Sequence, residues 1–69
     1  MKYGWIIENI VTEKFVKDPN NTTLILREAL VFGTRQAARD DRYKDEGEVV
    51  RKVELYKNGK VKKILPKRA

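Results

Sequence analysis

Apolar residues are spread over both alternating faces of residues 3–15. On a strand these side chains divide between one face (Trp5, Ile7, Val11) and the other (Ile6, Ile10). A strand with apolar groups on both faces is typical of the middle of a sheet. We therefore expect a central strand, followed by a turn at 17–21, where Pro19 presets one backbone angle and the Asp and Asn residues tolerate left-handed geometry.

A second alternating run covers residues 22–32. Its even positions carry Leu24, Leu26, Leu30 and Phe32, and its odd positions carry Thr23, Ile25, Ala29 and Val31. The β-branched and aromatic content favours a strand that forms a hairpin with the first. A helix is the alternative, because Leu26-Arg27-Glu28-Ala29-Leu30 has good helix propensity.

A helix is predicted next, from Arg35 to Asp45. Gly33 interrupts the strand pattern, Thr34 can cap the first turn, and Gly47 lies just past the expected end. The apolar stripe is thin and consists of Ala37, Ala38 and Tyr43. Small residues on that stripe would let the helix lie close to a sheet.

The C-terminal part gives the strongest local signal, which is a hairpin over residues 48–65. Asn58-Gly59 predicts a type I′ turn between a strand from Val49 to Lys57 and a strand from Lys60 to Leu65. The expected cross-strand pairs are Lys57–Lys60, Tyr56–Val61, Glu54–Lys63 and Val53–Ile64, with Leu55 on the core face beside Val53 and Ile64.

Together these elements predict an α+β fold of the order β-β-α-β-β. Its sheet is mainly antiparallel, is built from two hairpins and carries the helix on one face. The length of 69 residues suits one domain, which we place at residues 1–65, with 66–69 as a frayed basic tail. An apolar fraction of 41% is enough for a folded core.

The composition argues against catalysis, because His, Cys and Ser are all absent. Their absence removes the commonest general base, the two commonest nucleophiles and the usual ligands of transition metals. The helix acids Asp40, Asp41, Asp45 and Glu46 are interleaved with Arg42 and Lys44, which favours an ion-paired, solvated face over a metal site. We expect a small non-enzymatic binding module with no cofactor and no metal.

Positive charge is concentrated at the C-terminal end. Residues 1–50 hold eight Lys and Arg against nine Asp and Glu, whereas residues 51–69 hold eight Lys and Arg against Glu54 alone. The net charge of +6 therefore originates in the last 19 residues. The candidate site for nucleic acid or another anion comprises Arg51, Lys52, Tyr56, Lys57, Lys60, Lys62, Lys63, Lys67 and Arg68.

Cation clusters of this kind attract nucleic-acid backbones, because each neutralised phosphate releases condensed counterions. Six of the eight cations are Lys, which disfavours base-specific readout. Tyr56 is placed to stack on a base, and Tyr3 is the other aromatic residue expected at the surface. The alternative is that the lysines serve solubility and protect an exposed sheet edge.

Residues 30–39, Leu-Val-Phe-Gly-Thr-Arg-Gln-Ala-Ala-Arg, resemble a strand-to-helix junction of small phage and prophage proteins. The junction is also similar in outline to the sheet-to-helix corner of the arm-type DNA-binding domains of phage integrases. The layout of the whole chain is similar to small phage proteins that bind and inhibit host RNA polymerase. These resemblances imply a phage-type binding protein.

Two partner classes follow from the sequence. The first is the DNA or RNA backbone, bound by the C-terminal hairpin. The second is an acidic surface of a host enzyme such as RNA polymerase, for which the chain would act as a modulator or inhibitor. No stretch approaches the ~20 apolar residues of a membrane span, and no apolar signal segment opens the chain, so a cytoplasmic location is expected. A monomer and a homodimer formed through an edge strand both remain open.

Overall fold

The computed structural model describes residues 2–66 and contains one antiparallel sheet of five strands in the order β3-β2-β1-β4-β5. The elements are β1 (Lys2–Asn9), β2 (Lys14–Asp18), β3 (Asn21–Thr23), η1 (Leu26–Glu28), α1 (Arg35–Asp41), η2 (Lys44–Glu46), β4 (Glu48–Leu55) and β5 (Val61–Ile64). The predicted α+β class is confirmed, although the sheet has five strands and the helix is short. Within residues 2–66, no helix is long and apolar enough to cross a bilayer.

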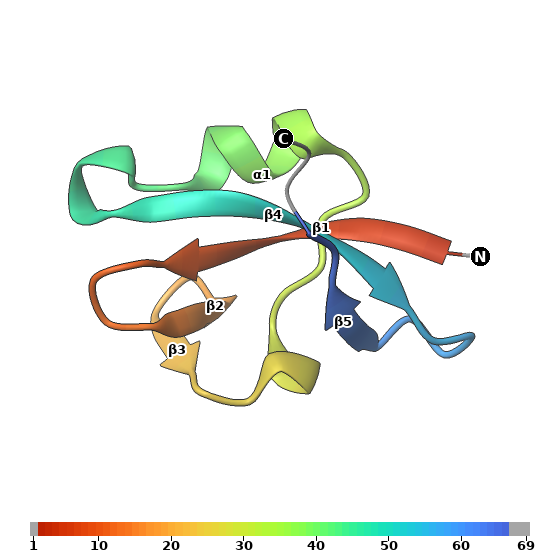
Figure 1. Cartoon of the computed structure of the whole chain (residues 1–69). Coiled ribbons are helices and arrows are strands. Elements are labelled where there is room, and N and C mark those ends of the chain that lie inside the picture. The colour runs from red at the N-terminus through yellow and green to blue at the C-terminus, as the bar shows by residue number, and fades with distance from the viewer. Residues whose placement is uncertain (1, 67–69) are drawn as a thin grey trace.

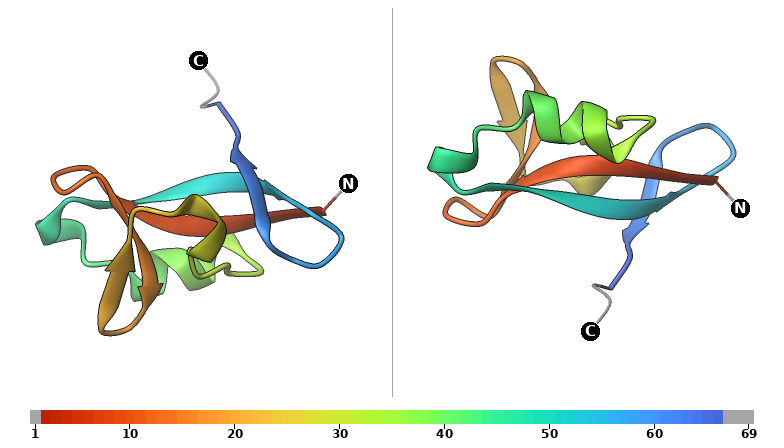
Figure 2. Two further views of the ribbon diagram at one scale, coloured as in Figure 1. Left: turned by 90° about the horizontal axis from the view of Figure 1, so that it is seen from below. Right: turned by 90° about the horizontal axis from the view of Figure 1, so that it is seen from above.

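The sheet curves into a half-barrel. Figure 1 shows α1 above the central strands β1 and β4, while β2, β3, η1 and β5 curl beneath them. The view from above in Figure 2 shows α1 running along β1, and α1 contacts both β1 and β4, while η1 packs against β5 on the opposite side. Both faces of the central strands are therefore covered, which explains why β1 carries apolar residues on both.

Two apolar layers hold these elements together. The core cluster on the enclosed side consists of Ile6, Ala29, Val53 and Val61, with Phe15, Leu26, Val31, Leu55 and Ile64 packed against it. On the other face, Ile7 and the helix residue Ala38 have no exposed surface. The methyl side chain of Ala38 lets α1 lie close to β1 and β4, which are the strands that it contacts.

The single strand predicted over residues 3–15 is wrong, because the chain turns at 10–13 and forms β1 and β2. The side chain of Asn9 starts this turn: its Oδ1 accepts hydrogen bonds from the backbone amides of Val11 (2.9 Å) and Thr12 (3.1 Å). Glu13 then adopts a left-handed conformation with φ of 61°. The prediction of a central strand is confirmed for β1, which lies in the middle of the sheet.

The strand predicted over residues 22–32 is also wrong. Only Asn21–Thr23 forms a strand, and it pairs with β2 across the turn that the sequence predicts at 17–21. The helical alternative is realised as the single turn η1, and Phe32 then returns to β1 as an isolated bridge to Trp5. The segment from η1 to Phe32 therefore covers the lower side of the half-barrel. The alternation of apolar residues along the chain cannot predict this path.

The predicted helix begins where expected but ends four residues early, at Asp41. Thr34 is the N-cap, since its Oγ1 accepts a hydrogen bond from the backbone amide of Ala37 (3.1 Å). Arg42 is extended, and the short turn η2 follows. Gly47 has φ of 85° and ends η2 rather than α1, and the side chain of Tyr43 is 65% exposed rather than part of the apolar stripe.

The C-terminal hairpin is confirmed, with a different turn. Within this turn only Gly59 has a positive φ. The amide of Tyr56 donates to the carbonyl of Lys60 (2.8 Å), and the carbonyl of Tyr56 accepts from the amide of Gly59 (2.9 Å), so the loop has three residues instead of two. The pairs Val53–Ile64 and Glu54–Lys63 are as predicted. The predicted pairs Tyr56–Val61 and Lys57–Lys60 are wrong, because Val61 lies opposite Leu55.

This difference has a local cause. One step along β4, from Glu54 to Leu55, corresponds to two steps along β5, from Lys63 to Val61. Lys62 is therefore the additional residue of a β-bulge. Beyond β5, the amide of Leu65 donates to the carbonyl of Lys52 (3.0 Å), and Pro66 is the last described residue. The remainder of the predicted tail, residues 67–69, lies outside the described part of the chain.

Candidate functional site

A groove lined by cationic side chains lies between α1 and the outer edge of β4. It has a volume of about 790 Å³. We call it the basic groove, and its lining residues are Arg35, Arg39, Arg42, Val49, Val50, Arg51, Lys52, Leu65 and Pro66. Five of these nine residues are cationic and none is acidic.

The helix supplies three of the five cations. Arg35, Arg39 and Arg42 are spaced i, i+4 and i+7, which at 3.6 residues per turn confines them to a stripe of about 60°. Arg42 follows α1 directly as its C-cap. The Thr34 cap and the buried Ala38 fix the start and the rotation of the helix, so the arginine stripe is turned toward β4.

The strand supplies Arg51 and Lys52, whose side chains leave β4 on opposite faces. Arg51 forms a half-buried ion pair, with its Nε 2.9 Å from Glu8 Oε1. Lys52 lies on the face of α1, with its Nζ 4.9 Å from the centre of the Tyr3 ring and 5.9 Å from that of Trp5. Glu8 therefore holds one groove cation in place, while Lys52 rests on aromatic rings.

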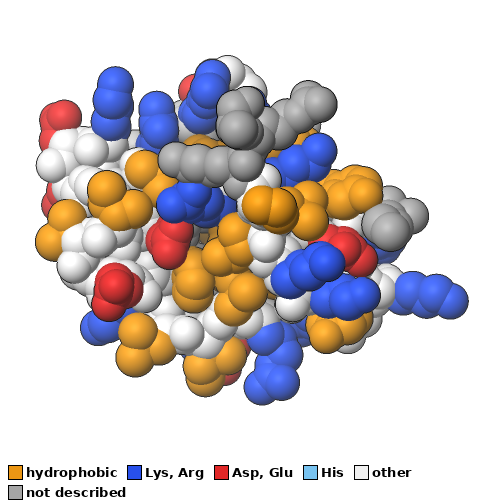
Figure 3. All heavy atoms as spheres, in the orientation of Figure 1, with side chains coloured by type: hydrophobic (Ala, Val, Ile, Leu, Met, Phe, Trp, Pro, Cys, Tyr) orange, Lys and Arg blue, Asp and Glu red, His pale blue; other side chains and the backbone are white. Residues whose placement is uncertain are grey.

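The other cations of the groove have no anionic partner in the described part of the chain. The ion pairs formed within residues 2–66 join Lys17 to Glu28, Arg51 to Glu8, and Lys62 and Lys63 to Glu54. Arg35, Arg39 and Arg42 take part in none of them. Figure 3 shows Lys and Arg side chains gathered along the upper edge over α1, apart from a second group beside the C-terminal hairpin.

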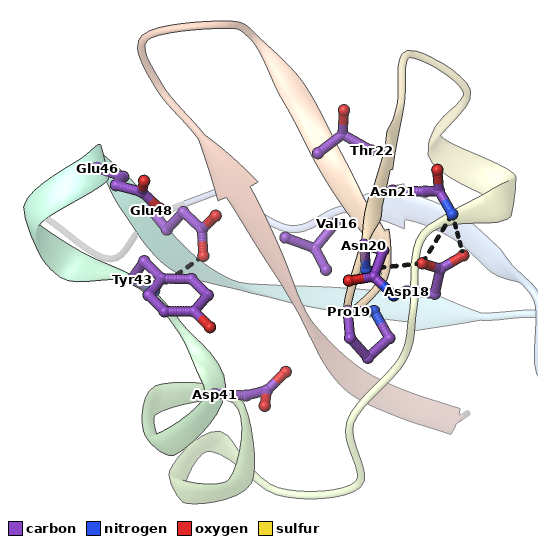
Figure 4. Close-up of a pocket in the computed structure, with 10 residues that line it drawn as sticks. All are labelled: Val16, Asp18, Pro19, Asn20, Asn21, Thr22, Asp41, Tyr43, Glu46 and Glu48. Atoms are coloured by element: carbon purple, nitrogen blue, oxygen red, sulfur yellow. Dashed lines mark hydrogen bonds between the residues drawn. The ribbon is translucent and has the colours of Figure 1, made fainter.

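The ion pairs expected among the helix charges are not formed within residues 2–66, because α1 separates acids from bases. Asp40 accepts a hydrogen bond from Gln36 Nε2 (2.8 Å), and Asp41 faces a smaller hollow of about 210 Å³ on the other side of the helix. The residues around this acidic hollow, shown in Figure 4, are Val16, Asp18, Pro19, Asn20, Asn21, Thr22, Asp41, Tyr43, Glu46 and Glu48. Its charge is opposite to that of the basic groove.

Two carboxylates of the acidic hollow are engaged within the fold. Glu48, which is buried, accepts a hydrogen bond from the backbone amide of Tyr43 (2.9 Å). Asp18 accepts from the side chain of Asn21 (3.0 Å to each oxygen) and from the amide of Asn20 (2.9 Å). The hydrogen bond from the Asn21 side chain is the main cause that lowers the pKa of Asp18 below its ordinary value. Among residues 2–66, no group of three or more acidic side chains is arranged to hold a metal ion.

The structure divides the cations predicted as one C-terminal site. Arg51 and Lys52 lie in the basic groove, whereas Lys57 and Lys60 lie in and beside the hairpin loop. Lys62 and Lys63 sit 3.5 Å and 3.9 Å from the carboxylate of Glu54, which offsets part of their charge. Lys67 and Arg68 lie outside the described residues. The hairpin cations therefore do not form one continuous surface.

Two exposed tyrosines each lie beside a lysine. Tyr56 is 50% exposed, and its ring centre is 6.0 Å from Lys62 Nζ. Tyr3 is 46% exposed and is the ring over which Lys52 lies. Because Lys52 also lines the basic groove, Tyr3 adjoins the groove and Tyr56 does not.

Three cations of the groove were missed by the sequence prediction, namely Arg35, Arg39 and Arg42. The charges of the predicted helix nearly cancel in the sequence, so a charge count along the chain did not identify these arginines. The signal that could have found them is their spacing, since three arginines within a 60° stripe of a helix lie on one face. What the sequence could not supply was the position of β4 beside that face.

Comparison of the chain with protein-family models, with curated proteins and with solved structures found no match.

Proposed function

We propose that the chain is a non-enzymatic binding module that holds the phosphate backbone of nucleic acid in the basic groove. The observation that carries this proposal is the lining of the groove, which contains four arginines and one lysine and no carboxylate. An anion that enters meets cations from the helix on one wall and from the strand on the other. Repeated phosphates are the biological polyanion that such a lining suits best.

The preponderance of arginine supports phosphate as the ligand. A guanidinium group presents a planar fork of N–H donors that matches two phosphate oxygens, and it is more weakly hydrated than an ammonium group. Arg35 and Arg39 are exposed and unpaired within the described residues, so their donors are available without breaking an ion pair. Phosphate binding at these arginines would displace counterions from the nucleic acid and would not break an ion pair within the described residues.

The groove is a better candidate than the hairpin that the sequence favoured. Glu54 lies within 4 Å of two of the hairpin lysines, so an approaching phosphate would also meet a carboxylate. Lys57 and Lys60 have no acidic partner among residues 2–66, and Lys2 lies beside them, with its Nζ donating to the carbonyl of Lys57 (3.4 Å), but they lie at an exposed turn outside the basic groove. We therefore place the principal phosphate contacts at the groove and use the hairpin loop as the control surface.

The test is fluorescence anisotropy with a labelled oligonucleotide at 0.1 M salt. The double variant Arg35→Gln/Arg39→Gln is compared with Lys57→Gln/Lys60→Gln, because each removes two charges from the same net charge of +6. Each phosphate contact contributes about fivefold at this salt concentration, so the groove variant should bind on the order of 20-fold more weakly. The hairpin variant should differ from the unmodified chain by less than about twofold.

Two results would overturn the proposal. Equal losses in the two variants would mean that net charge, and not the groove, governs binding. Failure of the unmodified chain to bind DNA or RNA at low salt would remove nucleic acid as the partner. Circular dichroism spectra of both variants establish that the fold is retained, which is expected because all four side chains are exposed.

A protein partner is the second candidate, and the open edge of β4 is the observation in its favour. Strand β5 pairs with β4 only at Val53–Leu55, and Leu65 reaches Lys52, so no described strand covers Val49–Arg51 on this side. An extended acidic peptide could add a strand there between the arginines. Strand addition would protect the Val50 amide from hydrogen exchange in the presence of an oligo-glutamate peptide, and unchanged exchange would exclude it.

A further inference from the structure

An aromatic surface continues the basic groove beyond Lys52. Tyr3 is 46% exposed at the start of β1, and Trp5 lies two residues along on the same face. The Lys52 ammonium lies 4.9 Å and 5.9 Å from the centres of these two rings, and the same lysine lines the groove. A chain of phosphates that ended at Lys52 would bring its next base over Tyr3.

The groove and the aromatic surface beside it together favour one form of nucleic acid. A hollow of about 790 Å³ lies within the range of about 300–1,000 Å³ that small-molecule sites occupy. It has room for a short stretch of one backbone. In a duplex the bases are also stacked inside, whereas a single strand exposes base faces that an aromatic ring can contact.

We propose, on the basis of the phosphate-binding function above, that the ligand is single-stranded DNA or RNA, with phosphates in the groove and a base stacked on Tyr3. The base replaces the Lys52 ammonium over the ring, and the flexible stem of Lys52 lets its charge follow the adjoining phosphate. Arg35, Arg39 and Arg42 then hold the preceding phosphates. Backbone contacts and stacking together bind a strand with little dependence on sequence.

The chain contains a matched control for the stacking residue. Tyr56 is 50% exposed and also lies beside a lysine, with Lys62 Nζ 6.0 Å from its ring centre, but it does not line the groove. Tyr3→Ala and Tyr56→Ala therefore remove rings of similar exposure. Tyr3→Phe keeps the ring and removes only the hydroxyl, so it separates loss of stacking from loss of any contact that the hydroxyl makes.

The experiment measures affinity for a labelled single strand and for a duplex of the same length by anisotropy at constant salt. We expect the single strand to bind at least tenfold more tightly. Tyr3→Ala should weaken single-strand binding at least fivefold while leaving duplex affinity unchanged. Tyr56→Ala and Tyr3→Phe should both bind the single strand as the unmodified chain does. Trp5 is the only tryptophan, so its emission should be quenched as the single strand binds.

The outcomes separate this inference from the proposed function. Equal affinity for strand and duplex, with dependence on Arg35 and Arg39 retained, would overturn the single-strand inference and leave phosphate binding intact. Equal losses in Tyr3→Ala and Tyr56→Ala, or a loss in Tyr3→Phe as large as in Tyr3→Ala, would overturn the role of the Tyr3 ring in stacking. Absence of binding to either nucleic acid would overturn the proposed function itself.

Discussion

Removing the helix arginines should flatten the salt dependence of binding, and the size of the effect follows from the groove. Four of its cations, Arg35, Arg39, Arg42 and Lys52, have no carboxylate partner in the described part of the chain, whereas Arg51 is held by Glu8 at 2.9 Å. Each phosphate neutralised on a single strand contributes about −0.7 to the slope of log affinity against log salt. Four contacts predict a slope near −3.

The triple variant Arg35→Gln/Arg39→Gln/Arg42→Gln keeps one such contact, so its slope should fall to about −0.7. Between 50 and 200 mM salt, the unmodified chain should lose about 50-fold in affinity and the triple variant less than about threefold. The assay is an anisotropy titration at four salt concentrations with one labelled oligonucleotide. A triple variant that retains a slope near −3 would refute the reasoning. So would a Lys57→Gln/Lys60→Gln variant whose slope falls, for each charge removed, as much as that of the triple arginine variant.

Three further predictions concern the scaffold. Gly4→Ala should lower the free energy of unfolding by about 1–3 kcal/mol, because the new methyl group would lie 2.7 Å from Val31 Cγ1; an unchanged urea midpoint would contradict this. Thr34→Ala removes the cap of α1 and should cost about 0.5–2 kcal/mol in thermal unfolding, with an unchanged melting temperature as the contrary result. The hydrogen bond from Asn21 lowers the pKa of Asp18, which adds folding stability that is present above pH 3.8 and is lost as the pH falls through the folded-state pKa. Asp18→Asn should remove this part of the pH dependence of the free energy of unfolding. Identical pH profiles of the variant and the unmodified chain would contradict this.

The elements that sequence alone could predict are those whose determinants are local. Asn58-Gly59 specifies a reversal wherever it lies between two apolar strands, and Thr34 specifies the start of a helix. The type of the reversal was not predictable, because the bulge at Lys62 changes the register near the loop. The end of the helix was missed because Arg42, a good helix former, is extended where the chain turns toward β4.

The alternation of apolar and polar residues gave wrong strand predictions where tertiary contacts and side-chain hydrogen bonds decide the structure. Residues 22–32 alternate like a strand, yet Leu24 is 70% exposed. The chain forms η1 instead, and Leu26 and Ala29 pack at the core on the lower side of the half-barrel. The run over residues 3–15 also alternates, but the Asn9 side chain bonds the following amides and reverses the chain. In both segments the apolar pattern indicated residues that lie at turns as well as residues of the core.

The candidate site was predictable in its chemistry but not in its position. The excess of positive charge after residue 50 is real, and two of its members, Arg51 and Lys52, lie in the groove. The remaining groove cations come from a segment whose charges nearly cancel in sequence. They become a site because α1 directs its arginines to one side and Asp41 to the other, and a linear charge count has no access to that separation.

The most direct test of the account is a nuclear magnetic resonance titration of the isotope-labelled chain with a short single-stranded oligonucleotide, followed through its backbone amides. Binding in the basic groove predicts that the largest shift changes occur at 35–42 and 49–52 and extend to Tyr3, while Lys57 to Lys60 change little. Shift changes that are largest at Lys57 to Lys60 and small along α1 would contradict the assignment of the groove as the binding site.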